Sequence, residues 1–284
     1  MTPPNLVRTS QVIETLLVSR NHRGMAQLRE VLEPGYLARA ATLIRNCRGD
    51  VYIVTGFPVA GSFETDGPAG AIALYRLCEH LGLSPIIVSD ESLTAALSAR
   101  YRCETLQRES TTTSDESVAA RYLARPPALV ISIERPGAAA DGRYYNMAGR
   151  DISDACVPAE AYLKQAPCPT IAIGDGGNEI GMGKVIEQLT HFDIHPAVST
   201  CDELVVADVS NWGAYAICAI AYAVEGQIPD MENNIRQDLT DLVALGAVDG
   251  VTGEPTPTED GLEADAGVKL MASIVKLLSE TDER

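Results

Sequence analysis

The sequence has no apolar segment long enough to cross a bilayer. Its longest nearly apolar run, Gly213 to Val224, has twelve residues, whereas a membrane-spanning helix needs about 20. The N-terminal stretch Met-Thr-Pro-Pro-Asn lacks the basic and apolar regions of a secretory signal, and it is not an Arg- and Ser-rich transit peptide. We therefore expect a soluble, cytoplasmic protein with no membrane partner.

Histidine is scarce, and the cysteines form no recognisable pairs. The seven cysteines are odd in number and irregularly spaced, and none lies in a Cys-x-x-Cys motif. This pattern argues against a disulfide framework or a zinc ribbon and for a reducing compartment. With four histidines in all, a histidine-centred mechanism has little support. His191, Asp193 and His195 would share one face of a strand as a metal site, but their position before Pro196 favours a surface turn after a helix.

Basic residues are few in the second half of the chain. Residues 1–142 contain 14 Arg and Lys against 15 Asp and Glu, whereas residues 143–284 contain 8 against 24. Nearly all of the net charge of −17 therefore lies in the second half. An acidic chain of this kind is a poor partner for nucleic acids and anionic membranes. We interpret the acids from Glu225 onward as solvated surface outside any binding site.

What the sequence does contain is a repeated alternation of short apolar runs and helical patterns. Continuous apolar runs are typical of strands buried on both faces of a parallel sheet. They lie at 51–56, 85–90, 128–134, 170–175 and 204–208, and helical patterns follow at 68–81, at 92–100, from the glycines after 175 to Leu189, and at 212–224. The alternation predicts an α/β fold, with an open doubly wound, mostly parallel sheet and helices on both faces.

We expect a single domain spanning residues 1–284. It would comprise a helical N-terminal segment (1–48) with Pro34-Gly35 between two helices, an α/β core (49–226), and an acidic helical C-terminal segment (227–284) interrupted at 249–258. In open α/β sheets, ligands bind beyond the carboxyl ends of the strands, near helix N-termini with free N–H groups. The loops that follow the strands are therefore the candidate site.

The loops after the first and third strands carry charged side chains. In the first of them, Glu64 and Asp66 are candidates for acid–base chemistry or metal binding, with capping of the following helix as an equal alternative for Asp66. In the other, Glu134 ends a strand at the expected crevice, and Arg135 and Arg143 offer forked donors for a carboxylate. The alternative is that Glu134, Arg135 and Asp141 pair among themselves to order the loop.

A glycine-rich loop, Gly174-Asp-Gly-Gly-Asn-Glu-Ile-Gly-Met-Gly-Lys184, follows the fourth strand. It misses the P-loop and dinucleotide-binding patterns because Asn178 and Glu179, respectively, stand where glycine is required. Its glycines still permit close backbone approach, and its acidic and amide side chains suit a short polar ligand or a divalent cation. After the fifth strand, Ser210 or Asn211 is expected to cap a helix.

Taken in order, these loops resemble the C-terminal domain of the D-glutamate cyclase-like family. The resemblance covers residues 50–225 most clearly. It rests on Gly-Phe-Pro-Val and Glu-Thr-Asp-Gly-Pro-Ala-Gly within 56–70, Ile-Glu-Arg-Pro-Gly at 133–137, Asp-Gly-Arg-Tyr-Tyr-Asn-Met at 141–147, Ile-Gly-Asp-Gly-Gly-Asn-Glu-Ile-Gly-Met-Gly at 173–183 and Val-Ser-Asn-Trp-Gly at 209–213. It implies a lyase of D-amino acid metabolism that interconverts D-glutamate and 5-oxo-D-proline, with water released on cyclisation.

That reaction needs a base for the amine, donors for a tetrahedral oxyanion, an acid to expel water, and cations for the substrate carboxylate. For it we assign proton transfer to four loop carboxylates: Asp66, Glu134, Asp175 and Glu179. Substrate binding is assigned to Arg135 and Arg143 as carboxylate holders, to Gly176, Gly177 and Asn178 as oxyanion donors, and to Asn211. The sequence requires no cofactor, and a divalent cation is compatible with the same carboxylates.

Two alternatives stay open. A metal-dependent enzyme acting on another small carboxylate or phosphorylated metabolite would use these carboxylates to hold Mg²⁺ or Ca²⁺. A non-catalytic metabolite-binding module would use the loops for recognition alone. The eukaryotic enzyme of the family has a further N-terminal hydro-lyase-like domain, absent from this sequence, that could carry the chemistry instead. The sequence also leaves a homo-oligomer open.

Overall fold

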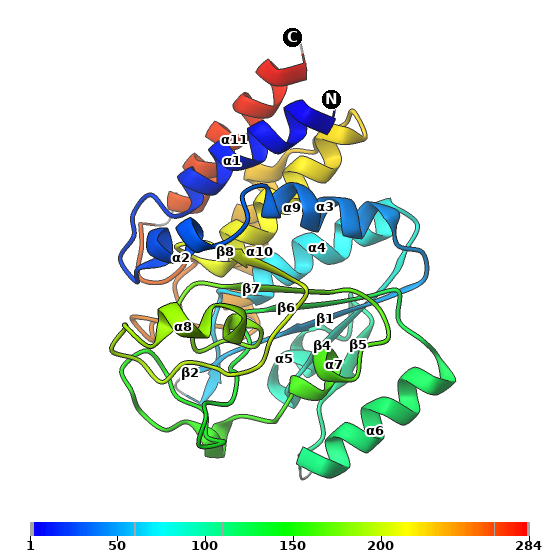
Figure 1. The fold of residues 1–284 in the computed structure, drawn as a ribbon, viewed down its shortest axis with the longest axis vertical. Helices are drawn as coiled ribbons and strands as arrows, with labels where there is room; N and C mark the ends of the chain where they lie inside the picture. Colours follow the sequence, from blue (N-terminus) through cyan, green and yellow to red (C-terminus); the bar gives the residue numbers. More distant parts are fainter. Residues whose placement is uncertain (1–2, 60, 109–110, 264, 283–284) are drawn as a thin grey trace.

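A computed structural model describes residues 3–59, 61–108, 111–263 and 265–282 and confirms the α/β fold. Its centre is a six-stranded parallel sheet in the order β5-β4-β1-β6-β7-β8 (Figure 1). The strands are β1 (Asp50–Thr55), β4 (Ser84–Ser89), β5 (Cys103–Thr105), β6 (Leu129–Ile133), β7 (Thr170–Gly174) and β8 (Glu203–Val206). The chain moves outward from β1 to β5 and then returns to β6 on the other side of β1, so the winding reverses between β1 and β6.

The strands are buried on both faces, as their continuous apolar sequences predict. All six residues of β1 are buried. Val51 and Ile53 contribute to one hydrophobic core, and Tyr52 and Val54 contribute to the other, because successive side chains of a strand point to opposite sides. The prediction of an open parallel sheet covered on both faces is confirmed.

Helices cover the two faces in unequal layers (Figure 1). One face carries α6 (Thr111–Ala124) and α7 (Glu160–Lys164), and the other carries α3 (Tyr36–Asn46), α4 (Pro68–His80) and α9 (Ser210–Val224). An outer layer of α1 (Pro3–Leu17), α10 (Met231–Ala244) and α11 (Ala266–Asp282) packs outside this second layer. Because α9 lies between the sheet and α1 and α11, all residues from Ser210 to Tyr222 are buried. None of the described helices is long and apolar enough to cross a membrane.

The helix predicted from the glycine-rich loop to Leu189 is wrong for most of its length. A short 3₁₀ helix (Met182–Val185) and the single turn of α8 (Ile186–Leu189) take its place. Gly177 and Gly181 adopt left-handed backbone angles, with φ of 105° and 98°. A right-handed helix cannot include such residues, so the loop runs irregularly up to Gly181.

The N-terminal segment and two regions of the α/β core also depart from the predicted pattern. The N-terminal segment contains three helices instead of two, because α2 (Met25–Val31) lies between α1 and α3. A short hairpin of β2 (Pro58–Val59) and β3 (Ser62–Phe63) follows β1, and α5 (Glu91–Leu97) is shorter than the predicted helix at 92–100.

The structure bears on two of the predictions for cysteine and histidine, the lack of a disulfide framework and the surface turn. All seven cysteines are free thiols. Residues 191–195 form a turn in which His191, Asp193 and His195 are exposed, and the ring of His195 stacks on Tyr145 with centroids 3.9 Å apart. The surface-turn interpretation of this segment therefore holds.

Candidate functional site

The polar loops converge at the carboxyl edge of the sheet, around a pocket of about 410 Å³. The pocket lies beside the ends of β1 and β6, where the winding reverses, which is the usual ligand position in open α/β sheets. Its charged lining residues are Arg23, Glu64, Glu134, Arg150 and Asp260, and its other lining residues include Phe57, Met147, Asn178 and Val251. Of the site residues assigned from sequence, Glu134 and Asn178 line this pocket.

Asp66 and Asn211 join the N-termini of α4 and α9. The Asp66 carboxylate accepts hydrogen bonds from the backbone N–H groups of Ser210 (3.0 Å) and Asn211 (2.7 Å), so it caps α9. The Asn211 amide oxygen accepts from the N–H groups of Gly67 (2.8 Å) and Gly70 (2.7 Å) at the start of α4. Each helix is thus capped by a residue next to the other, and the prediction that Ser210 or Asn211 caps its own helix is wrong.

Glu259 closes this junction from the loop between α10 and α11. One carboxylate oxygen accepts from Asn211 Nδ2 (2.9 Å) and from the hydroxyl of Tyr215 (3.3 Å), and the other accepts from Trp212 Nε1 (3.1 Å). Burial raises the pKa of Glu259 to about 7. Since Asn211 Nδ2 also donates to the Thr65 carbonyl, its amide is fully engaged within the protein, and the geometry does not support Asn211 as a substrate ligand.

Glu134 leaves the end of β6 in a left-handed conformation with φ of 42°, which is uncommon outside glycine. Its Oε2 accepts a hydrogen bond from Ser210 Oγ (2.6 Å). Gly67 makes room for this arrangement, because a Cβ at Gly67 would lie 2.6 Å from the Cβ of Glu134. A strained residue that its surroundings hold in place is typical of functional sites. The structure therefore places Glu134 in the crevice where the sequence predicted it.

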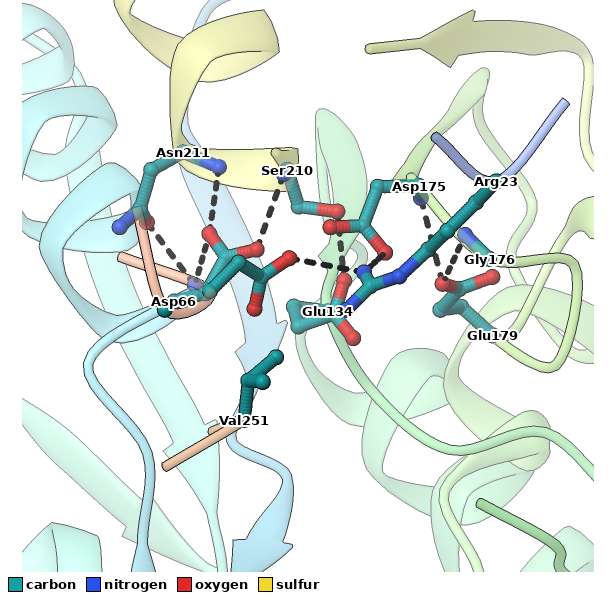
Figure 2. Close-up of polar contacts among 12 residues, drawn as sticks. Arg23, Asp66, Glu134, Asp175, Gly176, Glu179, Ser210, Asn211 and Val251 are labelled. Carbon is teal, nitrogen blue, oxygen red and sulfur yellow. Dashed lines mark hydrogen bonds and ion pairs between the residues drawn. The ribbon is translucent and has the colours of Figure 1, made fainter. Parts of the chain in front are cut away.

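Glu179 fills the anion-binding turn that the sequence assigned to the substrate. Its carboxylate accepts hydrogen bonds from the N–H groups of Asp175 (3.2 Å), Gly176 (2.7 Å) and Gly177 (2.7 Å). Successive N–H groups that converge in this way form a concave site for one anion. Because Glu179 already occupies it, Gly176 and Gly177 are not available as oxyanion donors, and that interpretation is corrected. Glu179 and Gly176 are seen together in Figure 2.

Arg23 enters the carboxylate cluster from the loop between α1 and α2. Its Nη1 lies 2.6 Å from Asp175 Oδ1 and 2.7 Å from Asp260 Oδ2, and Figure 2 shows its side chain extending toward Glu134. Burial opposes the charge of Arg23, but the two carboxylates outweigh burial and raise the pKa of the guanidinium above its usual value. Sequence reasoning missed Arg23 because no motif surrounds it and it lies 152 residues before Asp175.

The loop between α10 and α11 supplies acids that the sequence analysis placed on a solvated surface. Glu259 and Asp260 are buried, as are Asp249 of the same loop and Asp238 of α10, so that interpretation is wrong for these four acids. Asp249 orders the loop by accepting four hydrogen bonds from residues 251–261. The available signal was the Gly-, Pro- and Thr-rich composition of 249–258, which resembles that of the loops after the strands.

Five carboxyl groups around the pocket resist ionisation. Burial is the main cause that raises the pKa of each of them, namely Glu64, Asp66, Glu134, Asp175 and Asp260. Repulsion from neighbouring carboxylates adds to the effect, while Arg23 opposes it at Asp175 and Asp260. Carboxyl groups whose pKa is raised by burial and by neighbouring charge are typical of sites that transfer protons.

The same carboxylates form two groups with spacing suited to a cation. In the part of the chain that the structure describes, Asp66, Asp175 and Asp260 each place one oxygen within 4.8 Å of the others, and Glu134, Asp175 and Glu179 do the same. Ligand sets made only of oxygen suit Mg²⁺ or Ca²⁺. Arg23 already supplies one positive charge to the first group through Asp175 and Asp260.

The structure does not bring Arg135 or Arg143 to the pocket. Arg135 is fully buried, donates to both oxygens of Asp90 (2.8 and 3.0 Å), and also donates to the backbone. Arg143 is exposed and lies 3.4 Å from Asp151. The alternative that Glu134, Arg135 and Asp141 pair among themselves is also wrong, because Arg135 pairs with Asp90 and Glu134 accepts from Ser210. Asn178, by contrast, lines the pocket, where its Nδ2 donates to the Tyr145 carbonyl (2.8 Å).

Comparison with known proteins agrees with the loop pattern. Residues 13–275 match the family described as "D-glutamate cyclase-like, C-terminal". Over 213 residues the chain is 33% identical to human "D-glutamate cyclase, mitochondrial", a stretch that is 66% of this chain and 34% of that protein. The chain thus matches about a third of the length of this relative.

A solved structure of an exopolyphosphatase-related protein from Bacteroides fragilis aligns with a TM-score of 0.43 at 8% identity, covering 89% of this chain and 58% of that one. The family match at residues 13–275 includes the sheet, most of the helices that cover it and the loops that form the pocket. The chain therefore belongs to the D-glutamate cyclase-like family, in which it matches the C-terminal part.

Proposed function

We propose that the chain interconverts D-glutamate and 5-oxo-D-proline plus water. The name of the human relative, D-glutamate cyclase, and its 33% identity support this reaction. The observation that carries the proposal is the cluster of buried carboxyl groups that lines the pocket, namely Glu64, Glu134 and Asp260. Both directions of the reaction need one group that donates a proton and one that accepts a proton.

The proton balance of the reaction fits such a cluster. On cyclisation, the nitrogen of D-glutamate bonds to its own γ-carboxyl carbon and loses two protons. A C–O bond of the tetrahedral intermediate then breaks, and the departing oxygen leaves as water with two protons. Carboxyl groups at the pocket can carry both transfers, and in the reverse direction they can activate water to open the lactam.

Glu134 and Asp260 are the carboxyls that we assign to proton transfer, because both line the pocket. Ser210 fixes one oxygen of Glu134 (2.6 Å) and leaves the other for the reacting group. Asp66 and Glu179, in contrast, are engaged with backbone N–H groups. We assign these two a positioning role in the loops that form the pocket.

A turnover assay tests the proposed function. The purified chain is incubated with D- and L-glutamate and with both 5-oxoprolines, and the products are separated by chiral chromatography. We expect turnover of the D-forms and a rate about 10²–10⁴-fold lower in Glu134→Gln. The control is Glu187→Gln, at an exposed glutamate of α8, which should retain the native rate. A native rate in Glu134→Gln contradicts the assignment, and binding of the D-forms without turnover supports a metabolite-binding module instead.

The two clusters of three carboxylates favour a second candidate function. This is a metal-dependent enzyme that acts on another small carboxylate or on a phosphorylated metabolite. Thermal unfolding with EDTA or with Mg²⁺, Mn²⁺ or Ca²⁺ tests it, because a cation at 100 times its Kd adds about 2.7 kcal/mol to the free energy of unfolding. The candidate predicts a rise in Tm that is lost in Asp175→Asn, since Asp175 belongs to both groups. Exposed Asp154 provides the control, Asp154→Asn. A Tm that no cation changes contradicts the candidate.

A further inference from the structure

Arg23 has donor groups that the protein does not use. Its Nη1 contacts both Asp175 (2.6 Å) and Asp260 (2.7 Å), whereas its Nε and Nη2 form no hydrogen bond to any residue in the described ranges. The side chain is 16% exposed, and it lines the pocket. The guanidinium is thus anchored at one nitrogen, with its remaining N–H groups available to a ligand.

The backbone around Arg23 is held in place by contacts of its own. Asp208 accepts hydrogen bonds from the N–H groups of Arg20 (2.7 Å) and Asn21 (3.0 Å). Asn21 adopts φ of 51°, and its side chain accepts from the N–H of Ala26 (2.9 Å) at the start of α2. These contacts fix the loop on both sides of Arg23, so the position of the guanidinium is built into the fold.

Neither arginine that the sequence assigned to the substrate occupies an equivalent place. Arg135 is buried against Asp90, and Arg143 lies outside the pocket. Arg150 lines the pocket but is exposed, so solvent weakens its attraction for an anion. Arg23 is the cation whose neighbours are the buried carboxyls.

We infer that Arg23 binds the α-carboxylate of the substrate. The adjacent carboxyl groups of Glu134 and Asp260 then face the nitrogen of the substrate. This inference rests on the proposed function and names the residue that recognises the substrate. A guanidinium pairs with a carboxylate through parallel N–H donors. A guanidinium beside carboxylates is complementary to the zwitterionic head group of an α-amino acid. Without Arg23, an anion that enters the pocket would find no positive charge among the buried acids.

The test compares two ligands that differ at the recognised group, 5-oxo-D-proline and its uncharged amide, 5-oxo-D-prolinamide. Calorimetry measures both affinities in the native protein, Arg23→Gln and Arg23→Lys. We expect the native protein to prefer the acid by about 10- to 100-fold, the range of a charged hydrogen bond. Arg23→Gln should remove this preference, and Arg23→Lys should keep part of it, because it retains the charge but loses the planar fork.

Arg100→Gln is the matched control, because Arg100 pairs with Asp241 on the surface (2.5 Å) and is not in the pocket lining. It should leave the preference unchanged. A merely structural role for Arg23 would weaken both ligands equally, and this result overturns the inference. Equal binding of acid and amide by the native protein overturns it too, even if Arg23→Gln fails to fold. Binding of neither ligand, with no turnover of D-glutamate, instead rejects the proposed function and this inference with it.

Discussion

Replacing Asn211 with alanine distinguishes a structural role from a substrate-binding role. The resemblance to the D-glutamate cyclase-like family suggests that Asn211 binds the substrate. In the structure, however, the side-chain amide of Asn211 makes all of its hydrogen bonds within the protein. Its oxygen accepts from Gly67 (2.8 Å) and Gly70 (2.7 Å), and its nitrogen donates to the Thr65 carbonyl (3.1 Å) and Glu259 (2.9 Å). The structure therefore predicts a loss of stability from Asn211→Ala.

The size of that loss follows from the four bonds. Asn211 is fully buried, and each buried hydrogen bond contributes about 1 kcal/mol net, with more when a partner is left unpaired. Asn211→Ala should therefore lower the free energy of unfolding by about 4 kcal/mol. For a domain of this size, where each kcal/mol shifts Tm by roughly 2–4 °C, the expected fall in Tm is roughly 10 °C.

Urea unfolding followed by circular dichroism measures this change. The matched control is Asn233→Ala, at an exposed asparagine in the first turn of α10, which should change the free energy of unfolding by less than about 0.5 kcal/mol. Native stability in Asn211→Ala, combined with lost turnover, would refute the structural reasoning and restore Asn211 as a substrate ligand. Lost stability with native turnover at a temperature where the variant remains folded supports the structural role.

The remaining predictions concern one titrating acid, two arginines and one glycine. Burial raises the pKa of Glu259 above its usual 4.5 to about 7, so the native state binds that proton more tightly than the unfolded chain. Relative to Glu259→Gln, the free energy of unfolding should fall as the pH rises between these values, and a difference that is constant with pH in denaturant titrations contradicts this. Arg135→Met should destabilise the protein by about 3–5 kcal/mol in urea unfolding because it leaves a partly buried aspartate unpaired. Arg143→Ala, at an exposed pair, should change neither stability nor KM, and a raised KM would return Arg143 to the site. Gly250→Ala should lower turnover, because its Cβ would lie 1.9 Å from Glu64 Oε2; a native rate contradicts this contact.

The sheet could be predicted from the sequence because its signal is local. Each strand is a short apolar run, and burial on both faces requires an apolar side chain at every position, as in β1. The start of α4 could also be predicted from the sequence, because Pro68 suits the first turn of a helix and Gly67 is the N-cap of α4. Because ligands of open α/β sheets bind at the strand ends, the position of Glu134 at the end of a strand predicts that it lies in the crevice.

The caps and ion pairs of the site could not be predicted, because they join segments far apart in the chain. Asp66 was recognised as a capping candidate, yet it caps α9, 144 residues away. Glu179 binds the turn before it, an arrangement that depends on the left-handed Gly177. Propensity describes a residue and its neighbours, so it could not show which distant helix end Asp66 would face or that Arg23 would reach Asp175.

The acidity of the second half of the chain has a local role at the pocket. A cluster of buried acids comes from both halves and comprises Glu64, Asp66, Glu134, Asp175, Glu179, Glu259 and Asp260. Arg23 supplies the positive charge within it, from the nearly neutral first half. Removing so many carboxylates from water is unfavourable unless they are paired or protonated, and one arginine pairs directly with only two of them. Burial accordingly raises the pKa of Glu64, Glu134 and Asp260, and so favours their protonated forms. Each of these acids thus ionises less readily than an exposed one, and Arg23 supplies the positive charge beside them.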